Sequence, residues 1–108
     1  MYQISEADWK LFRSKIGAWQ EAYMDKLTRG YIELLSSGLP PSEKFWELNK
    51  RLKEDKRKVG VQVDMRRSLM ISNILSLLSE GAITLDDLEP FSDELREQIS
   101  YVLGVGQQ

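Results

Sequence analysis

The segment from Asp64 to Ser79, DMRRSLMISNILSLLS, is the most apolar stretch of the chain and constrains its fold the most. On a helical wheel of about 100° per residue, its apolar side chains fall on one arc roughly 160° wide. These side chains are Met70, Ile71, Ile74, Leu75, Leu77 and Leu78. A helix with so broad an apolar face packs inside a bundle, where it touches several neighbours.

The opposite side of this helix is a stripe of small polar residues: Ser68, Ser72, Ser76 and Ser79. A serine face is either solvated or, being small, lets another helix approach closely. Met65 and Leu69 border the stripe, which favours a second contact surface. A homodimer through this face is therefore one hypothesis.

A second pattern predicts one long helix from about Ser5 to Ser36. Eight apolar residues recur at steps of three or four and share an arc of about 120°. They are Trp9, Phe12, Ile16, Trp19, Tyr23, Leu27, Tyr31 and Leu34. The stripe stays in phase across Gly17 and Gly30, and at 1.5 Å per residue it is about 38 Å long. Because the short C-terminal helices cannot cover that length, part of it is expected to meet a partner.

The rest of the chain predicts further helices at 42–58, 62–80, 84–89 and 92–103. Ser5, Ser42 and Ser92 are the expected N-caps, and Thr84 opens a variant capping box with Asp87. Left-handed glycines are expected to end two helices, at Gly81 and Gly104. The inner faces of 42–58 and 92–103 are predicted to be Phe45, Leu48 and Leu52, and Leu95, Ile99 and Val102. We expect a single all-α domain over 1–108, a bundle of four to five helices with a frayed tail at 104–108.

Composition limits the chemistry that the chain can perform. It has 42% hydrophobic and 30% charged residues, as globular proteins do, and neither cysteine nor histidine. Disulfides, thiolate nucleophiles, the usual zinc sites and imidazole catalysis are therefore excluded. There is no glycine-rich phosphate loop and no calcium-loop pattern. We accordingly expect no enzyme, no cofactor and no metal site.

The N-terminus carries charges by residue 6, and the longest apolar run is three residues, Leu69–Ile71. A signal peptide needs an apolar core, and a membrane span needs about 20 apolar residues. The sequence therefore predicts a cytoplasmic protein that does not enter the membrane.

Charge is unevenly distributed along the chain. Residues 44–67 hold 9 basic and 4 acidic residues, whereas residues 68–108 hold 1 basic and 7 acidic residues. The basic section and the acidic section could attract each other within the fold, across a dimer or toward a charged partner.

One face of the second helix carries an aromatic residue among cations. Trp46, Lys50, Lys53 and Arg57 follow the spacing i, i+4, i+7 and i+11. Such a face could anchor a protein interface, or could stack on a base while its cations hold phosphate. Alternatively, Trp46 packs on a neighbouring helix under lysine stems. Acidic residues interrupt the basic surface, which weakens the nucleic-acid interpretation.

Arg66 and Arg67 begin the central helix and are candidates for an anion site or for structural ion pairs. Arg67 falls in the sector of Ile74, so an acidic partner is expected. The nearest candidates are Asp86, Asp87 and Glu89.

Several stretches taken together resemble a family of short all-helical proteins from gut-dwelling Gram-positive bacteria. They are Ser5-x-x-Asp8-Trp9-x-x-Phe12-Arg13, Trp19-Gln20-Glu21-x-Tyr23-Met24, Ser42–Trp46, Gly81–Thr84 and Phe91–Asp93. Members are often found on mobile elements, and some carry an automatic multidrug-transporter label. That label conflicts with the lack of a membrane span here. The resemblance implies a bacterial accessory protein and assigns no site residues.

The sequence therefore predicts a small helical module that binds a protein or regulates one, with a homodimer as one form of that binding. The alternative is a nucleic-acid-associated accessory protein that uses the basic section 44–67.

Overall fold

The computed structural model describes residues 2–104, and this part of the chain is helical without any strand. The α-helices are α1 (Glu6–Leu35), α2 (Pro41–Asp55), α3 (Met70–Glu80) and α4 (Asp93–Leu103). Two 3₁₀ helices, η1 (Arg67–Leu69) and η2 (Leu85–Leu88), lie before and after α3. The predicted all-α fold class is confirmed.

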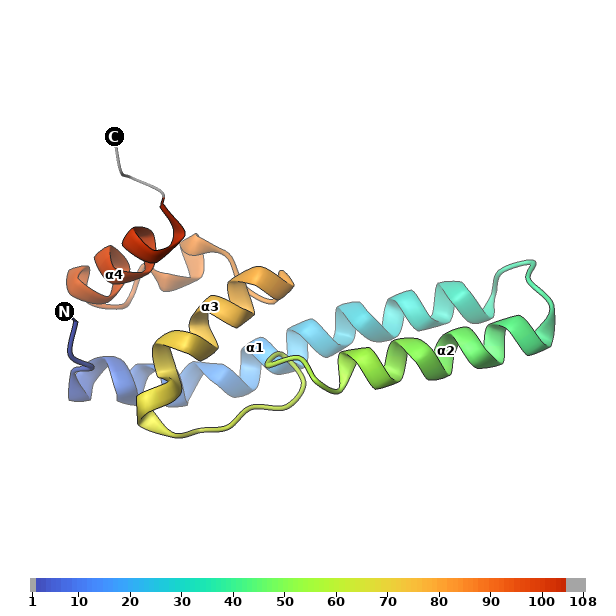
Figure 1. Cartoon of the computed structure of the whole chain (residues 1–108), viewed down its shortest axis with the longest axis horizontal. Coiled ribbons are helices and arrows are strands. Elements are labelled where there is room, and N and C mark those ends of the chain that lie inside the picture. The colour runs from blue at the N-terminus through green and yellow to red at the C-terminus, as the bar shows by residue number, and fades with distance from the viewer. Residues whose placement is uncertain (1, 105–108) are drawn as a thin grey trace.

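The molecule has two parts that share α1 (Figure 1). In the first, which we call the lobe, α3, η2 and α4 pack against the N-terminal half of α1. In the second, which we call the hairpin, the C-terminal half of α1 runs antiparallel to α2, out beyond the lobe. The turn at 36–40 is the tip of the hairpin, and the segment 56–61 is its base. The molecule measures 52 × 31 × 19 Å, so it is long and flat.

The hydrophobic core lies in the lobe. Its buried members are Phe12, Ile16, Met70, Ile74, Leu77, Ile83, Leu88, Phe91, Leu95 and Ile99. Trp9 and Trp19 are half-buried and pack against this core, where Trp19 lies 6.3 Å from the ring of Phe91. The apolar arc of α3 and the N-terminal half of the α1 stripe therefore form the core, as predicted.

Local signals placed most helix ends correctly. The side chain of Ser5 accepts the backbone N–H of Asp8 at 3.0 Å, and that of Ser92 accepts the N–H of Leu95 at 3.1 Å. Gly81 and Gly104 both have a φ of 76°, the left-handed conformation that ends a helix. Helix α1 continues through Gly17 and Gly30 without a break.

The predicted helix 62–80 begins too early. Residues 56–66 form an irregular connection, and the α-helix starts at Met70 after one 3₁₀ turn. Besides turn hydrogen bonds of its own, such as that from the N–H of Gln62 to the carbonyl of Lys58 at 2.9 Å, the backbone of this connection is held by side chains of α3. Asn73 donates its side-chain amide to the carbonyl of Asp64 at 3.0 Å, and Glu80 accepts two backbone N–H groups.

The prediction for α2 is also partly wrong. This helix starts at Pro41 with Pro40 as its N-cap, so Ser42 does not cap it, and it ends at Asp55. The short helix predicted at 84–89 is present as the 3₁₀ helix η2, and Thr84 forms the predicted capping box with Asp87, to which it donates its N–H at 2.8 Å. Of the tail predicted at 104–108, residues 105–108 lie outside the described residues.

The predicted inner faces are partly wrong as well. Leu95 and Ile99 of α4 are buried, but Val102 is half exposed at 50% because α4 has run past the core by then. In α2, Phe45 is 63% exposed and Leu52 is 40% exposed, while Leu48 is half-buried.

Asp8 joins the two ends of the lobe. Its buried carboxylate accepts the N–H of Ser92 at 3.0 Å, the hydroxyl of Ser92 at 2.6 Å and the hydroxyl of Tyr2 at 2.7 Å. Burial alone would raise the pKa of Asp8, but these hydrogen bonds outweigh it and lower the pKa below its usual range. Burial, and then the bond to Asp8, raise the pKa of Tyr2 to about 12. The ionised carboxylate of Asp8 thus links the N-terminal end of α1 to the N-terminal end of α4.

We predict that Asp8→Asn destabilises the protein by about 1.5–3 kcal/mol at neutral pH, because an amide cannot accept all three hydrogen bonds. Since the folded pKa lies below the unfolded one, the contribution of Asp8 is complete above a pH of about 4 and is lost as the pH falls through the folded pKa. Urea denaturation at several pH values measures this. A variant whose deficit stays the same at every acidic pH would contradict the assignment.

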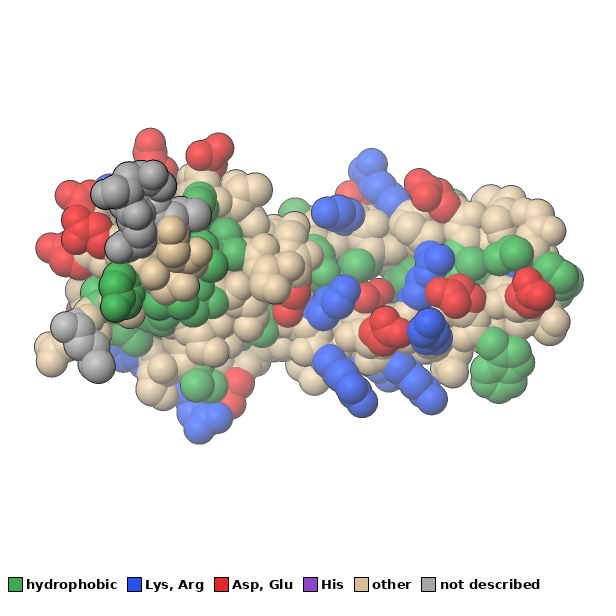
Figure 2. Space-filling model, turned by 45° about the horizontal axis from the view of Figure 1, so that its top comes forward, with side chains coloured by type: hydrophobic (Ala, Val, Ile, Leu, Met, Phe, Trp, Pro, Cys, Tyr) green, Lys and Arg blue, Asp and Glu red, His purple; other side chains and the backbone are tan. Residues whose placement is uncertain are grey.

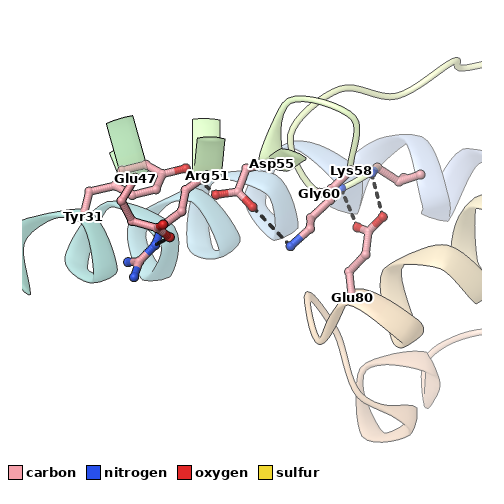
Figure 3. A network of polar contacts seen from close by, with 8 residues as sticks. Tyr31, Glu47, Arg51, Asp55, Lys58, Gly60 and Glu80 are labelled. Carbon is pink, nitrogen blue, oxygen red and sulfur yellow. Dashed lines mark hydrogen bonds and ion pairs between the residues drawn. The ribbon is translucent and has the colours of Figure 1, made fainter. Parts of the chain in front are cut away.

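The base of the hairpin is fixed to α3 by one carboxylate. Glu80 accepts the N–H groups of Val59 and Gly60, each at 2.9 Å (Figure 3). Gln20 of α1 donates to the carbonyl of Val59 at 3.0 Å. Gly60 is buried against the ring of Tyr23, where a Cβ atom would lie 2.3 Å from a ring carbon. This close approach requires glycine.

We predict that Gly60→Ala destabilises the protein by about 1–3 kcal/mol, because the added methyl group overpacks the contact with Tyr23. Gly30→Ala is the matched control: it lies inside α1, and a methyl group added there would have no neighbour within 4 Å. That control is expected to stabilise the protein by about 0.5–1 kcal/mol. Thermal denaturation compares the two, and equal effects would contradict the packing argument.

Candidate protein-interaction surface

The two helices of the hairpin meet through polar side chains as well as through the buried Leu34 of α1. Tyr31 of α1 donates to the carboxylate of Asp55 at 2.5 Å, and Lys58 pairs with the same carboxylate at 3.1 Å. We call these three residues the polar clasp (Figure 3). Arg51 and Glu47 form an ion pair at 2.9 Å farther along α2. Charged groups of α2 therefore lie at its contact with α1, beside the half-buried Leu48.

Titration of the clasp follows from its hydrogen bonds. Burial, and then the bond to Asp55, raise the pKa of Tyr31 to about 12. The hydrogen bond to Asp55 raises the pKa of Lys58 as well. Tyr31 therefore stays a donor and Lys58 stays charged throughout the physiological range, and the clasp does not act as a pH switch there.

Because charged groups of α2 face α1, the apolar residues of α2 are turned to one side. Met24, Thr28, Tyr31 and Leu35 of α1 follow the spacing i, i+4, i+7 and i+11, and so do Phe45, Asn49, Leu52 and Lys56 of α2. We call this surface of eight residues the open face. A groove of about 180 Å³ in it is lined by Met24 and Leu27 of α1, by Leu52 of α2 and, at the base of the hairpin, by Val61 of the connection after α2. No residue of α3, η2 or α4 lines this groove.

Large apolar side chains reach the surface along the hairpin, especially near its tip. They are Ile32, Leu35, Leu39, Phe45, Trp46 and Leu52, of which Phe45 and Trp46 touch edge to face at 5.0 Å. Exposed apolar patches mark interaction sites when they are large. Figure 2 shows apolar side chains along the hairpin and acidic side chains gathered over the lobe. The hairpin is therefore the candidate site.

The structure places the four predicted site residues, three in α2 and Arg57 directly after it, at the surface. Trp46 is 64% exposed, and Lys50, Lys53 and Arg57 are exposed too. Trp46 and Lys50 line a second groove of about 530 Å³ with Leu34, Leu39 and Glu43, whereas Lys53 and Arg57 do not line it. The interpretation that Trp46 packs under lysine stems against a neighbouring helix is wrong.

Both arginines at the start of the central segment form ion pairs. Arg66 pairs with Asp64 at 2.7 Å, which lowers the pKa of Asp64, and Arg67 pairs with Glu6 at 2.6 Å. The partners expected for Arg67, which were Asp86, Asp87 and Glu89, are wrong. The reason is that Arg67 lies in a 3₁₀ turn before α3, out of phase with Ile74, and points to the start of α1.

The sequence did not single out the open face. Phe45 and Leu52 were assigned to a core, and Met24 and Leu35 lay outside the predicted stripe. The available signal was the excess length of the α1 stripe, which indicated that part of it would need a partner. No group of three acidic residues in residues 2–104 is arranged to hold a metal ion. Within those residues, no helix has both the length and the apolar character to cross a bilayer.

Comparisons of the chain with protein-family models, with curated proteins and with solved structures give no match. The family resemblance therefore stays a prediction, and the geometry of the hairpin is the basis for a function.

We predict that Phe45→Ala changes the free energy of unfolding of the monomer by less than about 0.5 kcal/mol, because Phe45 packs on no core residue. Phe12→Ala, which empties a fully buried position, is the control and should cost about 3–5 kcal/mol. Urea denaturation of dilute protein measures both. A loss above about 2 kcal/mol for Phe45→Ala would mean that this residue stabilises the monomer and is not available to bind a partner.

Proposed function

We propose that this chain is a protein-binding module in which the lobe supports a helical hairpin and the open face of that hairpin binds another protein chain. The single observation that carries the proposal is the exposed apolar surface of the hairpin, centred on Phe45 and Leu52. A two-helix layer with apolar groups on one side resembles half of a bundle, and a second chain would complete it.

The arrangement of stabilising contacts supports the same proposal. The hydrophobic core lies in the lobe, and the polar clasp holds α2 against α1. Phe45 and Leu52 of the open face, which are 63% and 40% exposed, therefore contribute little to the core of the monomer. Residues that a fold does not use for its own core, yet that stay large and apolar, are typical of binding surfaces.

The nucleic-acid alternative has weaker support. Of the nine basic residues in 44–67, four pair with carboxylates: Arg51, Lys58, Arg66 and Arg67. A phosphate-binding surface needs cations free to replace counterions. The other five are interrupted by the acidic residues Glu47 and Glu54 of the same section.

A photoreactive amino acid in place of Phe45 tests the proposal in cells that produce the chain. We predict covalent adducts heavier than the 12.5 kDa chain, since a bound protein would lie against this position. The matched control is the same photoreactive residue at Tyr101, an aromatic residue of α4 that is 69% exposed, against 63% for Phe45.

Adducts are read by gel mobility and mass spectrometry, which separate a doubled chain from an adduct with a different protein. Equal labelling from both positions, or no adduct from Phe45, would overturn the binding role of the hairpin.

A further inference from the structure

The open face has the repeat of a helix-bundle seam on both of its helices. Its residues recur at steps of four, three and four in α1 and in α2, which is the heptad spacing by which antiparallel helices interlock. The groove in this face is lined by the hairpin alone, with no residue of the lobe. A partner therefore meets a surface made by two helices, and two more helices would complete a four-helix bundle.

We propose that the occupant of the open face is a second copy of this chain, packed face to face and tip against tip. The proposal rests on the proposed function and names its partner. In a two-fold dimer the same patch contacts itself, so each copy must offer both halves of every contact. In the tip-to-tip arrangement, α1 of each copy lies against α2 of the other. The edge of α1 then runs along the edge of the partner's α2 at the same height.

In this arrangement, the exposed side chains along α1 are complementary to those along α2 of the other copy. Near the tip, α1 exposes Ile32 and Leu35, and α2 exposes Phe45. Apolar groups therefore meet apolar groups at that end of the interface.

Near the base, charges of opposite sign meet. The edge of α1 carries the exposed acids Glu21 and Asp25, of which Asp25 also pairs with Arg29 at 3.0 Å. The edge of α2 carries the exposed cations Lys53, Lys56 and Arg57. Acidic and basic edges face each other twice by symmetry, which favours the contact and fixes its orientation.

The reversed arrangement, tip against base, does not match. It would lay α1 against α1, so that Ile32 of one copy meets the acidic edge at Glu21 and Asp25 of the other. An apolar group would then be buried against carboxylates that lose water and gain no partner. The distribution of charge thus selects one of the two symmetric packings.

The area of the open face determines how strongly the two copies are expected to bind each other. With 15 residues in α2, it is about 22 Å long and about 20 Å wide, or on the order of 450 Å² in plan per copy. The pair buries about 900 Å² in plan and somewhat more in accessible area, which is at the lower end of specific interfaces. We therefore expect a dimer that dissociates on dilution.

Sedimentation equilibrium over a dilution series tests the second copy. We expect a reversible monomer–dimer equilibrium for the wild type, and about tenfold or greater weakening by Phe45→Ser, since symmetry removes the contact twice. Tyr101→Ser, at an equally exposed aromatic residue of α4, should leave the equilibrium unchanged. A wild type that stays monomeric at every concentration, or equal weakening by both variants, overturns the proposal.

The orientation is tested with single cysteines, because the chain has none of its own. Thr28 of α1 and Lys56, directly after α2, line the same groove from opposite sides, and both lie on the base side of the Tyr31–Asp55 hydrogen bond. In the tip-to-tip dimer, Thr28→Cys protein mixed with mass-tagged Lys56→Cys protein should form a mixed disulfide. Thr28→Cys alone should not, since two copies of this position would be about 10 Å apart, beyond disulfide reach.

Met24→Cys mixed with Leu35→Cys should remain uncross-linked, because only the reversed packing brings these positions together. Disulfides in that mixture, or in Thr28→Cys alone, overturn the tip-to-tip arrangement. Photoadducts at Phe45 with a different protein, combined with a monomeric wild type, would leave the proposed function standing and remove the second copy. The two failures are therefore distinguishable.

Discussion

The length of α1 decides the shape of this protein. Its 30 residues make a helix of about 45 Å, whereas α3 and α4 have 11 residues each and reach about 16 Å. The lobe can therefore cover only the N-terminal half of α1, where Phe12 and Ile16 join the core. The other half packs against α2 and, at Tyr23, against the base of the hairpin. Because α3 and α4 are short, part of the apolar stripe of α1 is not covered by any helix of the lobe.

The rotation of α2 about its own axis determines what that surface consists of. If Phe45 and Leu52 faced α1, the hairpin would bury them and would present charge to the solvent. Instead Asp55 faces α1, where it accepts the hydroxyl of Tyr31 and pairs with Lys58. Ion pairs and short hydrogen bonds have strict geometry, so the clasp fixes the rotation, and the apolar side chains point to the open face as a consequence.

The sequence predicted what depends on local signals. The N-caps Ser5 and Ser92 and the left-handed Gly81 act within one turn of their helices, so their patterns suffice. The sequence-based prediction failed where contacts between residues far apart in the sequence determine the structure. Val59 and Gly60 are held by Glu80, about 20 positions away, which no periodicity reveals. Phe45 was assigned to a core because an apolar stripe is usually buried, and the rotation of α2 set by Asp55 could not be read from spacing.

A polar contact between the hairpin helices has a physical advantage for a binding module. A hairpin that used Phe45 and Leu52 for its own stability would have no apolar surface left to offer. One that exposed them without another contact would separate from α1, since an isolated 15-residue helix is marginal in water. The clasp at Asp55 and the bonds from Glu80 to Val59 and Gly60 keep α2 in place whether or not a partner is bound. Binding therefore needs no folding step, and its free energy is not reduced by the entropy of ordering the hairpin.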